Sequence, residues 1–190
     1  IHSTGNPLST AKNEADNVCK NQPEKQVSFH IVVDDKEAYQ VIPLNEVAWH
    51  AGDGVKGTGN LESIGIEICE SGHREKTLLN AVDVVYEVMQ KTGIDINHIA
   101  QHKNWSGKNC PRILIDKSQI KFGLDWNWFM KKLKEKVANS ELNKNEHWAK
   151  KNLNNLVQKG IIKSPDAHED LDAPITKGQL FAIIDRITDK

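Results

Sequence analysis

This sequence of 190 residues lacks several features that identify nucleic-acid-binding, membrane-spanning or exported proteins. Its 25 basic and 26 acidic side chains leave a net charge of −1, so no general positive field favours nucleic acid or another polyanion. No apolar run approaches the roughly 20 residues that a membrane span requires, and no signal peptide is recognisable. We therefore expect neither a nucleic-acid partner nor a membrane span.

An initiator Met is also missing, and the chain opens on a residue pair typical of a strand end. We therefore expect that a preceding segment, including most of the first strand, lies outside this sequence.

Cysteine is scarce, and its count of three is odd, which excludes a framework of paired disulfides. Cys19 falls on the apolar stripe of a predicted helix and Cys69 in an apolar strand. Buried free thiols are favoured over a disulfide between them. This use of cysteine indicates synthesis in a reducing cytoplasm.

Helical and strand patterns alternate along the first 138 residues, which indicates an α/β fold. Apolar residues at helical spacing predict helices that end near Asn21, at Gly93 and at Val137. Runs rich in β-branched residues predict strands, the first two forming a hairpin around Asp34–Lys36. The predicted helices cover residues 9–21, 76–91 and 124–137, and the predicted strands 27–33, 38–42 and 63–70.

The segment from Pro43 to Gly59 is irregular and contains four glycines, as expected of a loop that lines a cleft. Trp49 and His50 lie within it, and they suit contact with a sugar or peptide, although a Trp that covers the core is nearly as compatible. His30 lies in the first predicted strand, where a half-buried packing role is favoured over a ligand role.

The stretch from Gln101 to Arg112 carries an imidazole, an ammonium and a thiol on His102, Lys108 and Cys110. Imidazole nitrogen and thiolate sulfur are donors that zinc prefers. Eight positions separate His102 from Cys110, which is too long for one helical face but suits a loop that returns on itself. A structural role for the pair remains an alternative.

Five motifs resemble, in order, those of the zinc-dependent N-acetylmuramoyl-L-alanine amidases, a group that includes phage endolysins, bacterial autolysins and peptidoglycan-recognition proteins. They are IHSTGN, SFHIVVDD with AYQVIP, AWHAG, SIGIEICE and QHKNWSGKNCPRIL, and they span about residues 1–136. The resemblance implies a mixed, twisted β-sheet flanked by helices on both faces, with zinc in a groove at one side.

The resemblance also implies roles for single residues. His2, His102 and Cys110 would hold Zn²⁺ and leave a fourth position open, as catalytic zinc sites do. Glu67 would act as general base and Lys108 would stabilise the oxyanion. Phe29 stands where some relatives have Tyr, and a groove with Trp49, His50 and Trp105 would hold the substrate.

The implied substrate is peptidoglycan, cleaved between N-acetylmuramic acid and L-alanine on the outer side of the cell, as by an endolysin or autolysin. One alternative is a peptidoglycan-binding protein that has lost the chemistry. It is disfavoured by the presence of Cys110, Glu67 and Lys108. A cytoplasmic amidase that recycles muropeptides is the other alternative, and such relatives tend to use Asp as the third ligand.

Residues 139–190 form a predicted second domain, a small all-α helix-loop-helix after a polar linker at 138–140. Leu180, Ile183, Ile184 and Ile187 would form the inner face of its second helix, which begins with a capping box at Thr176 and Gln179. HWAKKNLNNLVQKGII and APITKGQLFAIIDRI together resemble one S-layer-homology-type unit. Such a unit implies binding to a secondary wall polymer, and self-association is the alternative.

Overall fold

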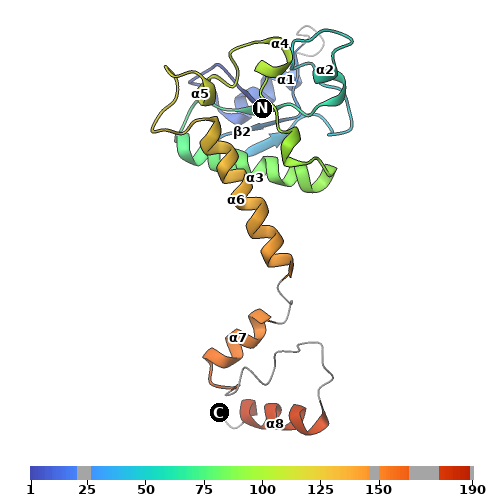
Figure 1. The fold of residues 1–190 in the computed structure, drawn as a ribbon, viewed down its shortest axis with the longest axis vertical. Coiled ribbons are helices and arrows are strands. Elements are labelled where there is room, and N and C mark those ends of the chain that lie inside the picture. Colours follow the sequence, from blue (N-terminus) through green and yellow to red (C-terminus); the bar gives the residue numbers. More distant parts are fainter. Residues whose placement is uncertain (21–26, 146–149, 163–175, 189–190) are drawn as a thin grey trace. The chain divides into compact units, whose positions relative to one another are not determined.

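The computed structural model describes residues 1–20, 27–145, 150–162 and 176–188 (Figure 1). The chain divides into two compact units, Ile1–Ala138 and Asn139–Lys190, and each is described by itself. None of the helices in the described ranges is long and apolar enough to cross a membrane.

A four-stranded mixed sheet organises the first unit, with the strand order β1-β4-β2-β3. Strands β1 (His2–Ser3) and β2 (Ile31–Val33) run parallel to β4 (Ile66–Ile68), and β3 (Ala38–Gln40) pairs antiparallel with β2, as the predicted hairpin requires. The strands are shorter than predicted. The N–H of Ser28 bonds the carbonyl of Trp49, outside the ladder, and the N–H groups of His30 and Ile31 both donate to Gly65 O, where regular pairing ends.

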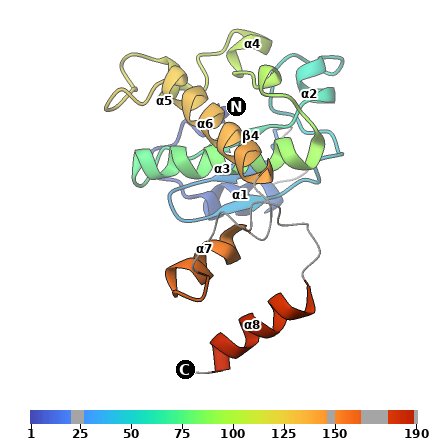
Figure 2. The same ribbon diagram turned by 60° about the horizontal axis from the view of Figure 1, so that its bottom comes forward.

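Alternating side chains give the sheet two different faces. Ile31, Val33, Ile66 and Ile68 join the main core, whose other buried members come largely from α3 (Arg74–Thr92), α5 (Arg112–Ile115) and α6 (Trp126–Asn145). On the opposite face, Val32 packs with Ala11 and Ala15 of α1 (Ala11–Lys20). Helices therefore flank both faces, as expected, and α6 crosses α3 in both views (Figures 1 and 2), where Lys136 of α6 pairs with Asp83 of α3.

Local signals define helix α3 at both ends. The side chain of His73 accepts a hydrogen bond from Lys76 N, and Gly93 ends the helix with φ 74° and an N–H bonded to Met89 O. Only glycine adopts that conformation without strain. Leu79 is 40% exposed because it flanks the buried stripe of Leu78, Val82 and Val85.

The two remaining cysteines differ in burial. Cys69 is fully buried and free, as predicted, and burial raises the pKa of its thiol to about 12. Cys19 is exposed, so its predicted burial is wrong. The reason is that α1 buries residues of its first two turns, Ala11 and Ala15, whereas Cys19 lies in the last turn.

Helix α6 buries Phe129 and Leu133 completely, with Trp128 half-buried, as predicted. It continues to Asn145, so the linker predicted at 138–140 is helical instead. Good helix formers such as Glu141 and Leu142 follow the polar residues, which explains the continuation. Three short elements complete the unit: α2 (Thr58–Glu62), the 3-10 helix η1 (Ile96–His98) and α4 (Lys103–Ser106).

The second unit contains α7 (Lys150–Gln158) and α8 (Lys177–Thr188). Gly160, with φ 68°, ends the turn after α7. Thr176 and Gln179 form the predicted capping box, with Thr176 N donating to Gln179 Oε1 and Gln179 N to Thr176 Oγ1. The predicted inner face is not buried, because Leu180, Ile184 and Ile187 are 43, 47 and 52% exposed. The Ile183 side chain and residues 146–149 and 163–175 of the predicted helix-loop-helix lie outside the described residues.

Candidate active site

Strand alternation places His2 away from the main core. Ile1 and Ser3 flank it, and Ile1 packs into the main core while the imidazole of His2 lies on the opposite face. In the parallel ladder His2 is the register partner of Glu67, which in turn pairs with Val32. His2 and Glu67 therefore project side by side on one face of the sheet, with His2 Nδ1 3.9 Å from Glu67 Oε1.

His102 and Cys110 meet because the loop between them closes on itself. Lys103 N donates to Cys110 O at 3.0 Å, and His102 N donates to Ile1 O at 3.1 Å, which ties the loop to β1. Gly107, with φ 75°, turns the chain back after α4. The structure thus brings the loop's two ends to the strand that carries His2.

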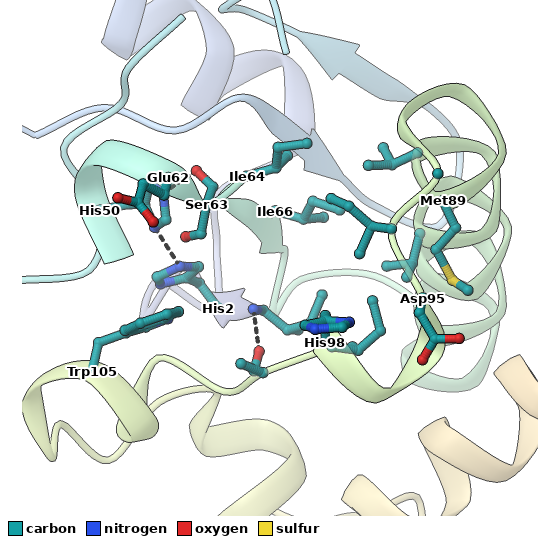
Figure 3. A pocket seen from close by; sticks show the side chains of 17 residues that line it. His2, His50, Glu62, Ser63, Ile64, Ile66, Met89, Asp95, His98 and Trp105 are labelled. Atoms are coloured by element: carbon teal, nitrogen blue, oxygen red, sulfur yellow. Dashed lines mark hydrogen bonds between the residues drawn. The ribbon is translucent and has the colours of Figure 1, made fainter. Parts of the chain in front are cut away.

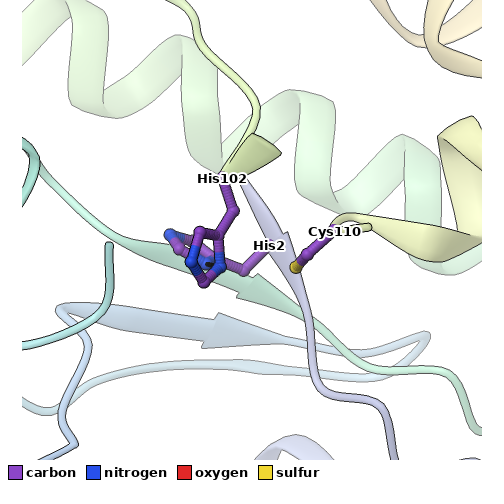
Figure 4. A group of neighbouring side chains, drawn as sticks. All are labelled: His2, His102 and Cys110. Carbon is purple, nitrogen blue, oxygen red and sulfur yellow. Dashed lines mark hydrogen bonds between the residues drawn. The ribbon is translucent and has the colours of Figure 1, made fainter. Parts of the chain in front are cut away.

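Three donor atoms converge at this point, one each from His2, His102 and Cys110 (Figure 4). They lie within 4.8 Å of one another, and the two Nδ1 atoms are 2.9 Å apart. Ligand atoms of tetrahedral zinc are separated by about 3.3–3.7 Å, given Zn–N near 2.0 Å and Zn–S near 2.3 Å. The donor set and its spacing therefore fit a zinc ion after small side-chain adjustments.

The environment of the cluster favours neutral imidazoles, which have a lone pair for a metal. Burial lowers the pKa of His102, assisted by Lys108, and it lowers that of His2 well below the ordinary value. Burial raises the pKa of the Cys110 thiol, whereas the N–H of Ser3, 3.3 Å from Cys110 Sγ, favours the thiolate.

Glu67 is the acidic group beside the cluster. Burial raises the pKa of its carboxyl to about 7, against the pull of the Lys108 ammonium. Its Oε2 atom is buried and has no hydrogen-bond partner within the described ranges. A carboxyl group with a pKa near neutrality can both take up and release a proton at physiological pH.

A cavity of about 340 Å³ joins these groups. The structure brings six of the predicted site residues to its wall, with Ser3, Thr4 and side chains of α1 as further lining. The six are Phe29, His50, Glu67, His102, Lys108 and Cys110.

The two predicted aromatic contacts are not in that cavity. Trp49 is 38% exposed and lines no part of it. Trp105, on α4, packs over Gly59, where an added Cβ would lie 2.8 Å from its ring. Trp105 lines a second, mainly apolar cavity of about 440 Å³ with Ile64 and Met89 (Figure 3).

Two predicted roles for histidine have different outcomes. His30 is fully buried rather than half-buried, and both ring nitrogens are engaged, by Gly65 N and by Glu46 O, which supports a structural role. His50 was predicted to contact substrate, yet it is only 7% exposed and its Nδ1 lies 3.0 Å from His2 Nε2.

Other residues of the site had no prediction. Glu70 and Arg112 form a two-bond ion pair with distances of 2.8 and 2.6 Å, which joins the segment after Cys110 to the exit of β4. Both lie at the ends of quoted motifs, but nothing in the sequence pairs them. Glu14 and Asn17 of α1 line the cavity, and their spacing of three residues places them on the same side of α1 as each other.

Comparison with known proteins gives consistent matches. Residues 1–113 match the family model described as N-acetylmuramoyl-L-alanine amidase. The amidase CwlH of Bacillus subtilis is 41% identical over 132 residues, 68% of this chain and 50% of that protein. The amidase CwlA of the same organism is 34% identical over 186 residues, 94% of this chain and 65% of that protein.

Among solved structures, the catalytic domain of XlyA is similar with 40% identity and a TM-score of 0.60, covering 70% of this chain and 82% of that chain. The chain thus spans about half the length of the relative CwlH but most of a solved catalytic domain.

Proposed function

Because this chain belongs to the N-acetylmuramoyl-L-alanine amidase family, we propose that it is a zinc-dependent hydrolase of peptidoglycan. The bond cleaved is the amide between N-acetylmuramic acid and the L-alanine of the stem peptide. The observation that carries the proposal is the convergence of donor atoms from His2, His102 and Cys110, with Glu67 3.9 Å from His2. Glu67, His102 and Cys110 also line one cavity.

The three donors would hold the zinc ion through one nitrogen each of His2 and His102 and through the sulfur of Cys110. Bound zinc supplies Lewis-acid activation of a water molecule and of the scissile carbonyl. Three protein ligands are typical of catalytic rather than closed structural sites. Burial of all three side chains, 2 to 5% exposed, keeps bulk water from competing for the donors.

Glu67 moves the protons in this proposal. Its carboxylate takes a proton from the attacking water and passes it to the departing amide nitrogen. Burial raises the pKa of its carboxyl to about 7, which suits a group that must accept a proton and then donate it.

Lys108 provides the positive charge that the tetrahedral intermediate needs. Its side chain is exposed and lines the same cavity as Glu67, so it can reach substrate at the mouth. An ammonium at this place stabilises the developing oxyanion. Phe29 forms part of the buried wall and has no hydroxyl, which leaves Glu67 and Lys108 as the polar groups for the intermediate.

The cavity would hold the start of the peptide stem, and the exposed indole rings of Trp49 and Trp105 would contact substrate further from the reacting bond. A half-exposed aromatic ring is suited to packing against a sugar face. The exposed rings therefore keep a proposed role in binding the glycan, outside the catalytic cavity.

The second unit would act as a targeting module for the wall. The match to CwlA covers 94% of this chain and so includes most of residues 139–190, which supports a unit shared with another amidase. Exposed apolar side chains on α8 equally suit self-association. Light scattering of the full chain separates the two, because only self-association gives a dimer or larger species.

Digestion of purified cell walls tests the function. We expect new N-terminal alanine without new reducing sugar ends. New reducing ends would indicate cleavage of the glycan instead, and binding to walls without any new ends would indicate the non-catalytic alternative. A strong preference for soluble muropeptides over intact walls would favour the recycling amidase.

A further inference from the structure

We propose that His50 is a positioning residue that orients the imidazole of His2 and fixes its tautomer, so that His2 Nδ1 has its lone pair toward the metal position. The inference rests on the proposed zinc site. It assigns to His50 a role in the protein framework instead of contact with substrate.

The argument follows a chain of hydrogen bonds that begins at the backbone. The carbonyl oxygen of Ser63 only accepts, and it lies 3.3 Å from His50 Nε2, so that nitrogen carries the proton. A neutral imidazole has one proton, so His50 Nδ1 is an acceptor. It lies 3.0 Å from His2 Nε2, which must then be the donor (Figure 3).

The tautomer of His2 decides which of its nitrogens can bind a metal. With its proton on Nε2, His2 has an unprotonated Nδ1, and this is the atom 2.9 Å from His102 Nδ1. One ring nitrogen of His2 lies within 4.8 Å of the donor atoms of His102 and Cys110. A ligating histidine is usually held by a hydrogen bond from its other ring nitrogen, and loss of that bond typically weakens metal binding by about 10–100-fold.

The surroundings hold His50 firmly enough for this role. The Asn60 side chain accepts hydrogen bonds from the N–H groups of both His50 and Ala51, at 2.9 and 2.8 Å. Gly65 allows the ring to approach, since a Cβ at Gly65 would lie 2.6 Å from it. His50 lines both the catalytic and the apolar cavity, so its ring is part of the wall between them.

Two variants of nearly equal shape test the proposal. His50→Asn keeps an acceptor close to the position of Nδ1, whereas His50→Leu has a methyl group there. We expect His50→Leu to weaken zinc binding by about 10–100-fold, measured by competition with a chelator. His50→Asn should retain most of the affinity. In zinc-loaded protein, the His2 Nε2–H proton should exchange with solvent faster in the Leu variant, as measured by nitrogen-15 NMR.

A third variant disturbs the same contact without changing a histidine. Gly65→Ala should displace the His50 ring and weaken zinc binding in the same direction. Gly178→Ala on α8 is the matched control, because a Cβ there meets nothing within 4 Å. If His50→Leu does not fold, as judged by circular dichroism, Gly65→Ala decides alone.

The outcomes separate this inference from the proposed function. If the unmodified protein binds no zinc, the proposed zinc site is wrong. Zinc binding that is unchanged in His50→Leu, or equally weakened in the Leu and Asn variants, would overturn the role of the hydrogen bond while leaving the zinc site intact. Unchanged binding in a folded Gly65→Ala variant would count against it as well.

Discussion

Removal of the Arg112 guanidinium should destabilise the first unit. We expect this because Arg112 links the segment after Cys110 to residues that follow β1 and β4. Arg112 Nε and Nη2 bind the two oxygens of Glu70, and Nη2 also donates to Gly5 O at 3.0 Å. Gly5 N donates to Glu70 Oε1 at 3.1 Å. In Arg112→Ala, Glu70, whose side chain is 3% exposed, would lose its ion-pair partner but keep its hydrogen bonds with Gly5 N and Ser3 and the attraction of the Arg74 guanidinium.

The expected cost follows from that geometry. Breaking a buried ion pair by removing one partner typically costs about 3–5 kcal/mol. The Arg112 side chain is 36% exposed, and the hydrogen bonds of Glu70 with Gly5 N and Ser3 remain, so water and these donors offset part of the loss. We expect about 2–3 kcal/mol, which for a unit of this size lowers the melting temperature by about 6–9 °C.

The pH dependence of unfolding should show that the Glu70–Arg112 ion pair is the source of this stabilisation. Burial opposes ionisation of Glu70, but Arg112 more than offsets it and lowers the pKa of the carboxyl below its ordinary value of 4.5. The contribution is therefore complete above about pH 4.5 and is lost as the pH falls through the lower, folded-state value. The difference in stability between Arg112→Ala and the unmodified protein should shrink over that range.

Urea unfolding of zinc-saturated protein, followed by circular dichroism, measures these differences. Arg112→Lys is the control that keeps the charge but not the two-bond geometry, and it should lose less than Arg112→Ala. A double-mutant cycle with Glu70→Gln isolates the pair. A coupling energy near zero, or the same loss at pH 7 and at low pH, would refute the reasoning.

Four further predictions concern the metal, the acid, the fold and the second unit. Elemental analysis should find about one zinc per chain, and full occupancy in a His102→Ala, Cys110→Ala double variant would contradict the ligand set. Glu67→Gln should keep its zinc but lose wall hydrolysis by about 10²-fold or more; near-normal turnover with zinc bound would show that another group moves the proton. Asp34→Ala removes the acceptor for the N–H groups of Ala11, Lys36 and Glu37 and should cost about 2–4 kcal/mol in urea unfolding, whereas a cost below about 1 kcal/mol would show that water replaces it. A chain ending at Asn145 should cleave soluble muropeptides at nearly the full rate but be less effective on intact walls; loss of soluble activity would make the second unit part of the catalytic fold.

Local patterns predicted the parts of the fold that depend on near neighbours. Helical spacing and Gly93 located α3 within two residues at its start and one at its end. The capping box at Thr176 and Gln179 was equally visible, because its partners are three residues apart. Long-range contacts were not predictable in the same way. The late start of β2, at Ile31 instead of Val27, depends on Ser28 meeting Trp49, and no periodicity in the sequence encodes that contact.

In the candidate site, too, residue types and motifs were predictive, whereas long-range contacts were not. Residue chemistry and motif order indicated His2, His102 and Cys110, and the structure brings their donor atoms together. The burial of His50 could not be predicted, because a polar residue in a glycine-containing loop is usually exposed. Its burial depends on Asn60 ten residues later and on the missing side chain of Gly65, and these contacts appear only in three dimensions.

The register of β4 connects the stability of the fold to the chemistry. Ile66 and Ile68 are 3% and 0% exposed in the main core, and Glu67 between them faces the cavity beside His2. A shift of one residue would turn Glu67 into the core and move both isoleucines out of it. Loss of burial alone would cost about 1.5–3 kcal/mol for each isoleucine, before the cost of a buried carboxylate. The packing of two apolar side chains therefore keeps the acid in the cavity. Substitutions that loosen these contacts should reduce activity even though neither isoleucine touches the catalytic cavity.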